Sequence, residues 1–328
     1  MSKVYFLKGF DRLELKMKNI LADFYSAKNK VLIKIHFGEP GNKFAFTPKD
    51  IKPVVTALDC LGLKSIFIDT PVAYNSPRNS IKGYEKVVKE RGYDQLSPFL
   101  ISKKSKKIKT KDFVAGVCQE LIEAENVLVL SHIKGHACAG FGGAIKNLGM
   151  GGVDKETKGM EHSLSHPRFA TECQGCGICA KLCPAKAIKM VDNKAKIDLN
   201  SCWGCSICQL QCPYKCLEPE KALFDDLLAQ GAAAVINNLP KRTFYINFIK
   251  NITKLCDCAT NPGGIIGKDI GVLFSDNPVA IDTASVDLIN ELNKKDLFQE
   301  INHKNPLLHV NFAEKYTNKE SDYELITV

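Results

Sequence analysis

The chain has 328 residues, which is enough for one large domain and a smaller one with most of their apolar surface buried. Hydrophobic residues make up 45% and charged residues 25% of it, values that exclude collagen-like, disordered and membrane-spanning chains. The formal net charge is +9. Because no apolar run is long enough for a signal-peptide core or a transmembrane helix, we expect a cytoplasmic protein without a membrane partner.

The first half of the chain alternates short β-branched runs with helical segments, as in βα units around a largely parallel sheet. Strands are predicted at residues 4–7, 31–36, 65–69 and 127–131. Within residues 46–62 the pattern predicts a helix, because Thr47 and Asp50 have capping-box spacing and Gly62 follows the last apolar position. A further helix is predicted at residues 112–124.

Residues 168–218 are rich in closely spaced Cys, Gly and Pro and too poor in apolar runs to form a core, so we expect this segment to need a metal to fold. After it the α/β pattern resumes, with helices predicted at 217–231 and 280–290 and strands at 233–236, 243–249 and 270–274. We therefore predict an α/β domain with a mixed or largely parallel sheet, made of residues 1–167 and 219–328, and an inserted α+β ferredoxin-like module at residues 168–218.

Eight cysteines of the inserted segment form two copies of the spacing C-x2-C-x2-C-x3-C-P. Three cysteines in a tight loop reach three irons of one 4Fe-4S cluster, and the fourth cysteine, followed by proline, ligates the other cluster. The predicted ligands of cluster one are Cys173, Cys176, Cys179 and Cys212. Those of cluster two are Cys202, Cys205, Cys208 and Cys183. A zinc ribbon does not explain the third cysteine of each copy, so two 4Fe-4S clusters are the predicted cofactors.

Segments outside the module resemble the uncharacterised Fe-S center proteins, a bacterial and archaeal family built on domain of unknown function 362. The resemblance is carried by KIHFGEPGNKFAFTPKDI, VLVLSHIKGHACAGFGGAIKNLGMGG, EHSLSHP, LCDC and DIGVLFSDNPVAIDTAS, and it extends nearly end to end. It implies an α/β domain interrupted by a two-cluster ferredoxin. The reaction and the substrate stay open.

A loop rich in glycine and basic residues follows the strand that ends at residue 131. Such a loop suits a small anionic substrate held by backbone amides at a helix N-terminus. Its candidate binding residues are Lys134, Gly142, Gly143 and Asn147. Neither the Rossmann nor the P-loop pattern is complete, and although the loop is compatible with a flavin, no motif requires one.

Five residues are candidates for chemistry: His136, Lys146, Cys256, Asp257 and Cys258. For His136 a catalytic and a structural role are both open, whereas a structural role is expected for His36. The pair Cys256 and Cys258 is compatible with an additional metal, with a redox thiol, with nucleophilic chemistry, or with two ordinary buried cysteines around a turn. Because both segments follow predicted strands, we expect them to converge on one pocket near a cluster.

Six lysines lie in one short run: Lys103, Lys104, Lys106, Lys107, Lys109 and Lys111. The run is either a solvated loop or a docking site for an acidic partner. Since no aromatic residue is interleaved with the lysines, nucleic acid is not expected. The partner that suits a redox protein is an acidic electron carrier of the ferredoxin or flavodoxin type.

The sequence thus predicts an iron–sulfur protein in which single electrons pass through two clusters to a site in the α/β domain. It would be an oxidoreductase or the electron-delivering subunit of one, and whether the chain is itself an enzyme stays open. Two alternatives also stay open: a ferredoxin-type carrier or docking module with no substrate of its own, and a redox-sensing cluster protein.

Overall fold

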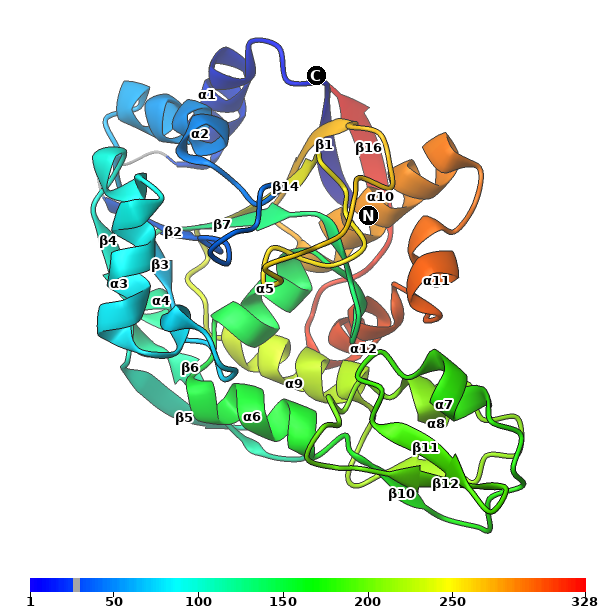
Figure 1. The fold of residues 1–328 in the computed structure, drawn as a ribbon. Coiled ribbons are helices and arrows are strands. Elements are labelled where there is room, and N and C mark those ends of the chain that lie inside the picture. Colours follow the sequence, from blue (N-terminus) through cyan, green and yellow to red (C-terminus); the bar gives the residue numbers. More distant parts are fainter. Residues whose placement is uncertain (26–29) are drawn as a thin grey trace.

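The computed structural model describes residues 1–25 and 30–328, and within them a sheet of eight strands forms the centre of the molecule (Figure 1). Its strands are β1 (Ser2–Lys8), β2 (Lys30–Lys34), β3 (Lys64–Asp69), β4 (Phe99–Ile101), β7 (Val127–His132), β14 (Thr243–Ile249), β15 (Gly271–Ser275) and β16 (Tyr323–Thr327). Their order is β16-β1-β15-β14-β7-β2-β3-β4. Only β15 is antiparallel to its neighbours in this sheet, so the predicted mixed and largely parallel α/β fold is confirmed.

Helices cover both faces of the sheet, because successive side chains of each strand point to opposite sides. Leu128 and Leu130 of β7 enter one core, which also contains apolar side chains of α1 (Leu13–Phe24), α2 (Pro48–Cys60) and α3 (Ile81–Glu90). Val127 and Val129 enter the other core, with α5 (Ala144–Gly151), α9 (Phe224–Ile236), α10 (Pro278–Asn293) and α12 (Leu308–Tyr316). The domain is therefore built in three layers.

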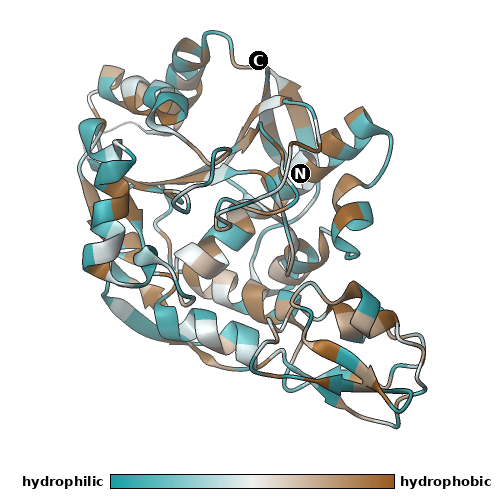
Figure 2. Ribbon diagram, in the orientation of Figure 1, coloured by the Kyte–Doolittle hydropathy of each residue, from teal (hydrophilic) through white to brown (hydrophobic). Residues whose placement is uncertain are grey.

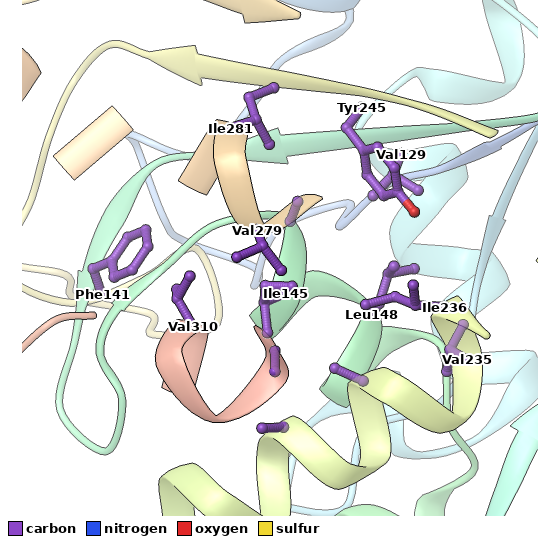
Figure 3. Close-up of a cluster of buried hydrophobic side chains, with 14 of the residues drawn as sticks. Val129, Phe141, Ile145, Leu148, Val235, Ile236, Tyr245, Val279, Ile281 and Val310 are labelled. Carbon is purple, nitrogen blue, oxygen red and sulfur yellow. The ribbon is translucent and has the colours of Figure 1, made fainter. Parts of the chain in front are cut away.

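Helix α5 lies at the centre of the second core, as Figure 3 shows. Its Ile145 and Leu148 side chains are completely buried beside Val279 of α10 and Val235 of α9. Figure 2 shows the same division by hydropathy, with apolar residues concentrated on the central strands and polar residues on the outer helices. This packing fixes the start of α5, which forms one wall of the site described below.

Several predicted elements agree with the structure, and two do not. Thr47 and Asp50 form the predicted capping box of α2. Residues 112–124, predicted as a helix, instead contain β6 (Val114–Cys118) and the short helix α4 (Gln119–Ile122), because β6 pairs with β5 (Ser105–Lys109). The predicted strand at 233–236 is wrong, because these residues continue α9.

Gly231 does not end a helix, as the sequence pattern predicted, but lies inside α9. A Cβ atom at this position would be 2.0 Å from Oε1 of Glu161 in α6 (Lys155–Ser163). The missing side chain therefore leaves room for the buried carboxylate of Glu161 between the two helices.

Residues 168–218 protrude from the α/β domain at the lower right of Figure 1. They hold two short antiparallel pairs, β10 (Pro167–Phe169) with β13 (Leu217–Pro219) and β11 (Ile188–Val191) with β12 (Lys194–Ile197). Two helices, α7 (Ile178–Leu182) and α8 (Ile207–Leu210), lie beside each other within the segment.

The remaining elements are short connections between these parts. They are η1 (Pro77–Asn79), η2 (Tyr93–Gln95), β8 (Lys134–His136), β9 (Gly140–Gly142) and α11 (Leu297–Asn302). None of the helices in residues 1–25 and 30–328 combines the length and the apolarity that crossing a membrane requires.

Candidate functional site

A small cavity of about 70 Å³ lies at the carboxyl ends of the parallel strands β2 and β7. Its walls come from these two strands, from the start of α5 and from the Cys256–Cys258 turn. The polar and sulfur-containing residues that line it are Lys34, His36, Ser131, His132, Lys146, Asn147, Met150, Cys256, Asp257 and Cys258. Parallel α/β sheets place ligand sites at this edge.

The basic loop that follows β7 contains the strand β8 (Lys134–His136), which packs against the segment leading into the Cys256–Cys258 turn. The amide of Gly135 donates a hydrogen bond to the carbonyl of Thr253 at 2.9 Å. A Cβ atom on Gly135 would be 2.2 Å from the carbonyl oxygen of Lys254, so only glycine permits this approach. As a result, one ligand atom each of His136, Cys256 and Cys258 lies within 4.8 Å of the other two.

His136 is held in a defined tautomer by the backbone. Its Nδ1 accepts hydrogen bonds from the amides of Cys138 at 3.2 Å and Ala139 at 3.1 Å. Burial, and then the charge of Lys146, lower the pKa of His136 well below its ordinary value, so the ring is neutral. A neutral ring whose Nδ1 accepts must carry its proton on Nε2.

Asp257, between the two cysteines, pairs with His132. Its Oδ2 lies 2.8 Å from Nδ1 of His132, whose Nε2 donates to the carbonyl of Lys250 at 2.9 Å. The His132 ring stacks on Phe46 with 4.2 Å between centroids. Burial acts to raise the pKa of Asp257, but the charge and hydrogen bond of His132 outweigh it and hold that pKa low, so the carboxylate is ionised.

Lys146 gives the cavity an excess of positive charge. No hydrogen bond or ion pair joins its ammonium group to another side chain or carbonyl in residues 1–25 and 30–328. Burial is the main cause that lowers the pKa of Lys146 to about 8. By contrast, Lys34 donates to Oδ1 of Asn147 at 2.7 Å and pairs with Asp69 at 3.1 Å.

The structure places two parts of the predicted anion loop differently from the expectation. Lys134 does not line the cavity, because its ammonium donates to the carbonyls of Phe44 and Asn251 and lies 3.9 Å from Asp257. Lys134 thus helps to hold the Cys256–Cys258 turn in place and does not face the cavity.

The first turn of α5 does not offer its amides to an anion either. The amides of Ala144 and Ile145 donate to the carboxylate of Asp282 at 2.7 and 2.8 Å. Gly142 and Gly143 line the cavity beside Lys146, and Asn147 lines it while bonding to Lys34. Side chains, and not a helix N-terminus, therefore supply the charge for an anion.

The cavity does not fit a flavin. Sites for ligands of that size have volumes of roughly 300–1,000 Å³, several times the 70 Å³ found here. The cavity has room for a small anion instead.

A second cavity, inside the protruding segment, is lined by four cysteines from both sequence copies: Cys183, Cys202, Cys205 and Cys208. Cys183 comes from the first copy and lies near the other three. Burial is the largest cause that raises the pKa of Cys202, and the Cys183 thiol raises it further. The Cys202 sulfur also accepts a hydrogen bond from the amide of Gly204 at 3.4 Å.

The other four cysteines of the two copies are Cys173, Cys176, Cys179 and Cys212, of which Cys173 and Cys179 pack in one apolar cluster with Cys183 and Cys208. Burial is the largest cause that raises the pKa of Cys179, and the nearby Cys173 and Cys176 thiols raise it further. Cys212 lies beside Cys216, with 3.4 Å between their sulfur atoms. The nearby Cys173 thiol contributes to the raised pKa of Cys216. Cys176 is exposed, whereas Cys205 and Cys208 are buried.

Lys304 connects the segment to the α/β domain. Its ammonium donates to the carbonyl of Cys138 at 2.5 Å and to that of Cys205 at 2.8 Å. It also forms an ion pair with Asp225, and both side chains are completely buried. Cys138 in turn is two residues from His136, which does not line the first cavity itself but lies against the Cys256–Cys258 turn of its wall.

Sequence reasoning missed two contributors to the first cavity, which are Lys34 and the pairing of His132 with Asp257. His36, for which a structural role is expected, also lines this cavity. The run KIH at the end of a strand was a usable signal, because two basic residues two positions apart point to the same side.

A protein-family model described as Domain of unknown function (DUF362) matches residues 31–287, which is more than half of the chain. A search of curated proteins gives no match. Among solved structures, a protein from Thermotoga maritima is similar with a TM-score of 0.47 at 10% identity, covering 94% of this chain and 59% of that chain. The lactate racemase apoprotein from Thermoanaerobacterium thermosaccharolyticum has a TM-score of 0.37 at 13% identity, covering 76% and 50%. The chain therefore matches less than two thirds of the length of either structure.

Proposed function

The chain belongs to the DUF362 family, and we propose that it is an iron–sulfur protein that transfers single electrons through two 4Fe-4S clusters to the cavity in its α/β domain. It acts as an oxidoreductase or as the electron-delivering subunit of one. When bound, such clusters accept and release one electron at a time.

The observation that carries this proposal is the joint cavity of Cys183, Cys202, Cys205 and Cys208. Three of these cysteines are close in sequence, but Cys183 belongs to the other copy of the motif, and crossing over is the pattern that two-cluster ferredoxins require. Four thiols around one small cavity form a soft donor set that suits iron–sulfur clusters or zinc. The duplicated spacing with its C-P endings favours the clusters.

Cluster one would be held by Cys173, Cys176, Cys179 and Cys212. Because Cys176 is exposed, we place the docking site of an electron donor beside cluster one, whereas the buried Cys205 is joined to Cys138 through Lys304. Electrons would therefore enter at cluster one and leave from cluster two toward His136 and the cysteine turn.

The cavity would take a small anionic substrate. Lys146 is the one ammonium group of its wall without a hydrogen-bond or ion-pair partner among the described residues, and it faces a space of about 70 Å³. A buried positive charge without a partner is stabilised when an anion binds beside it. His136, with a proton on Nε2, lies against the Cys256–Cys258 turn of the cavity wall and offers a hydrogen bond there to negative charge that develops during a reduction.

The proposed partner is an acidic electron carrier. Two of the six lysines of the 103–111 run are already engaged, since Lys107 pairs with Asp154 and Glu156 and Lys111 lies near Asp226. The β5 strand that holds much of the run is at the lower left of Figure 1, whereas the cysteine-rich segment is at the lower right. We therefore place the docking site on the segment and regard the lysine run as a solvated hairpin.

A potentiometric titration followed by electron paramagnetic resonance tests the proposal. The anaerobic full-length protein is expected to take up two electrons in one-electron steps, each producing a signal of a reduced 4Fe-4S cluster. A protein that shows no such signal at any potential would refute the proposal.

A further inference from the structure

We infer that Cys256 and Cys258 form a redox-active disulfide that accepts two electrons inside the α/β cavity. This inference deepens the proposed function, because it takes the iron–sulfur clusters as the source of the electrons. It assigns the immediate electron acceptor, which the proposed function leaves open.

The first observation is the bond itself. Cys256 and Cys258 are joined by a disulfide, whereas none of the other twelve cysteines is disulfide-bonded. Cys256 is 9% exposed, and both residues line the cavity, so a substrate in the cavity has access to the sulfur atoms. Disulfides of cytosolic proteins are usually transient and catalytic or redox-sensing, because that compartment keeps thiols reduced.

The second observation is the tautomer of His136, which argues against a metal held by His136, Cys256 and Cys258. A metal needs a ring nitrogen with a free lone pair, but Nδ1 uses its lone pair for two backbone amides and Nε2 carries the proton. The same arrangement suits a disulfide that is to be reduced, since the N–H of the neutral ring can donate a hydrogen bond to a sulfur atom that leaves as thiolate.

The step balances with two electrons and two protons. The bond between the two sulfur atoms breaks, each sulfur gains one electron, and each takes up one proton to give two thiols. The clusters of the proposed function supply the electrons one at a time. The ammonium of Lys146 in the cavity wall supplies one proton and solvent water supplies the other. The neutral ring of His136, which has one nitrogen within 4.8 Å of both sulfur atoms, keeps its proton and stabilises the developing thiolate through a hydrogen bond.

The turn is held so that it survives opening of the disulfide. The amide of Glu39 donates to the carbonyl of Asp257 at 2.8 Å, and Asn42 donates to the carbonyl of Ala259 at 2.8 Å. Neither these two hydrogen bonds nor the pairing of Asp257 with His132 involves the sulfur atoms. Both thiols therefore stay beside the cavity after reduction.

Anaerobic alkylation of the full-length protein tests this inference. Trypsin cleaves after Lys254 and Lys268, so one peptide, residues 255–268, holds both cysteines and no other. Reduced ferredoxin serves as the only reductant in one arm, and a dithiothreitol buffer serves in the other. The readout is the fraction of this peptide that carries two alkyl groups, measured by mass spectrometry, with Cys60 as a control because it is an exposed free thiol.

We expect reduced ferredoxin to convert the peptide to the doubly alkylated form in the wild-type protein. In Cys183→Ser, which lacks a ligand of cluster two, the rate should fall at least tenfold, while dithiothreitol reduces both proteins equally. Alkylation of the Cys60 peptide should not depend on either reductant.

The inference fails if the iron-loaded wild type keeps the peptide unmodified under reduced ferredoxin, and the proposed function would then still stand. It also fails if the peptide is protected in both arms and one zinc ion per chain is retained beside it. If the protein holds no iron and sulfide, the proposed function fails. No clusters are then present to supply electrons, even if dithiothreitol reduces the disulfide.

Discussion

The backbone carbonyls of Cys138 and Cys205 both accept hydrogen bonds from the ammonium group of Lys304, at 2.5 and 2.8 Å. Cys138 belongs to the loop that leads from the α/β cavity, and Cys205 belongs to the cysteine-rich segment. A single buried cation therefore holds together the two parts between which electrons are proposed to move. Asp225 neutralises that cation, and both side chains are inaccessible to solvent.

Replacing Lys304 with Met should destabilise the protein by about 3–5 kcal/mol, because Asp225 would be left as a buried charge without its partner. Urea unfolding of the anaerobic protein measures this change. The double variant Lys304→Met with Asp225→Leu removes both charges and should recover a large part of the loss. A single variant as stable as the wild type would show that the pair does not hold the segment in place.

Replacing Cys183 with Ser should remove cluster two, although this cysteine belongs to the first copy of the motif. The reason is its position in the cavity with Cys202, Cys205 and Cys208. Iron analysis and electron paramagnetic resonance should show about half of the iron and the signal of one cluster only. Cys60→Ser, at an exposed thiol, is the matched control. If the signal lost is also lost in Cys176→Ser, the crossover assignment is wrong.

The affinity of the cavity for anions should depend on pH through Lys146. Burial lowers the pKa of Lys146 to about 8, so its ammonium is charged below that pH and becomes neutral as pH rises through it. With sulfate as a probe of constant charge, calorimetry should show affinity that is constant near pH 6–7 and falls by up to about tenfold per pH unit above pH 8.

Lys146→Met should abolish this pH dependence and weaken sulfate binding, whereas Lys103→Gln, at an exposed lysine, should change neither. The free energy of unfolding, measured as a function of pH, also checks that the variant is folded. A lysine whose folded pKa is lowered opposes folding while it is charged, so the free energy of unfolding of the wild type should rise between pH 8 and 10, and less so in Lys146→Met. Sulfate affinity that stays constant up to pH 9.5 would contradict the assignment of Lys146.

Charge reversal should distinguish the two basic surfaces. Lys186→Glu with Lys189→Glu, on the cysteine-rich segment, should slow electron uptake from an acidic ferredoxin at low salt, and the difference should shrink as ionic strength rises. Lys103→Glu with Lys104→Glu, on the lysine run, should leave the rate nearly unchanged. Stopped-flow kinetics measures both, and the opposite ranking would place the partner on the lysine run.

Much of the fold was predictable because its signals are local. The apolar runs of β7, β14 and β15 are typical of strands that are buried on both faces of a sheet. The capping box of Thr47 and Asp50 spans only four residues of the sequence. Residues 114–118 were mistaken for part of a helix because they pair with the lysine-rich strand β5 in a hairpin, and this pairing overrides their own propensity.

The site was predictable only where residue type and spacing carry chemistry by themselves. The basic loop with His136 and the Cys256–Cys258 turn have that property, and the structure brings them together. Lys304 and Asp282 could not be predicted, because their roles depend on partners more than a hundred residues away in Cys138 and Ala144. No pattern within their own segments marks them.

The iron and acid-labile sulfide content of the anaerobically purified full-length protein tests the central claim most directly. Two cubane clusters require about eight iron and about eight sulfide per chain, and we expect both values together. Stoichiometric zinc without sulfide would contradict the claim, because it would mean that the cysteines of the inserted segment hold a structural metal that cannot carry electrons.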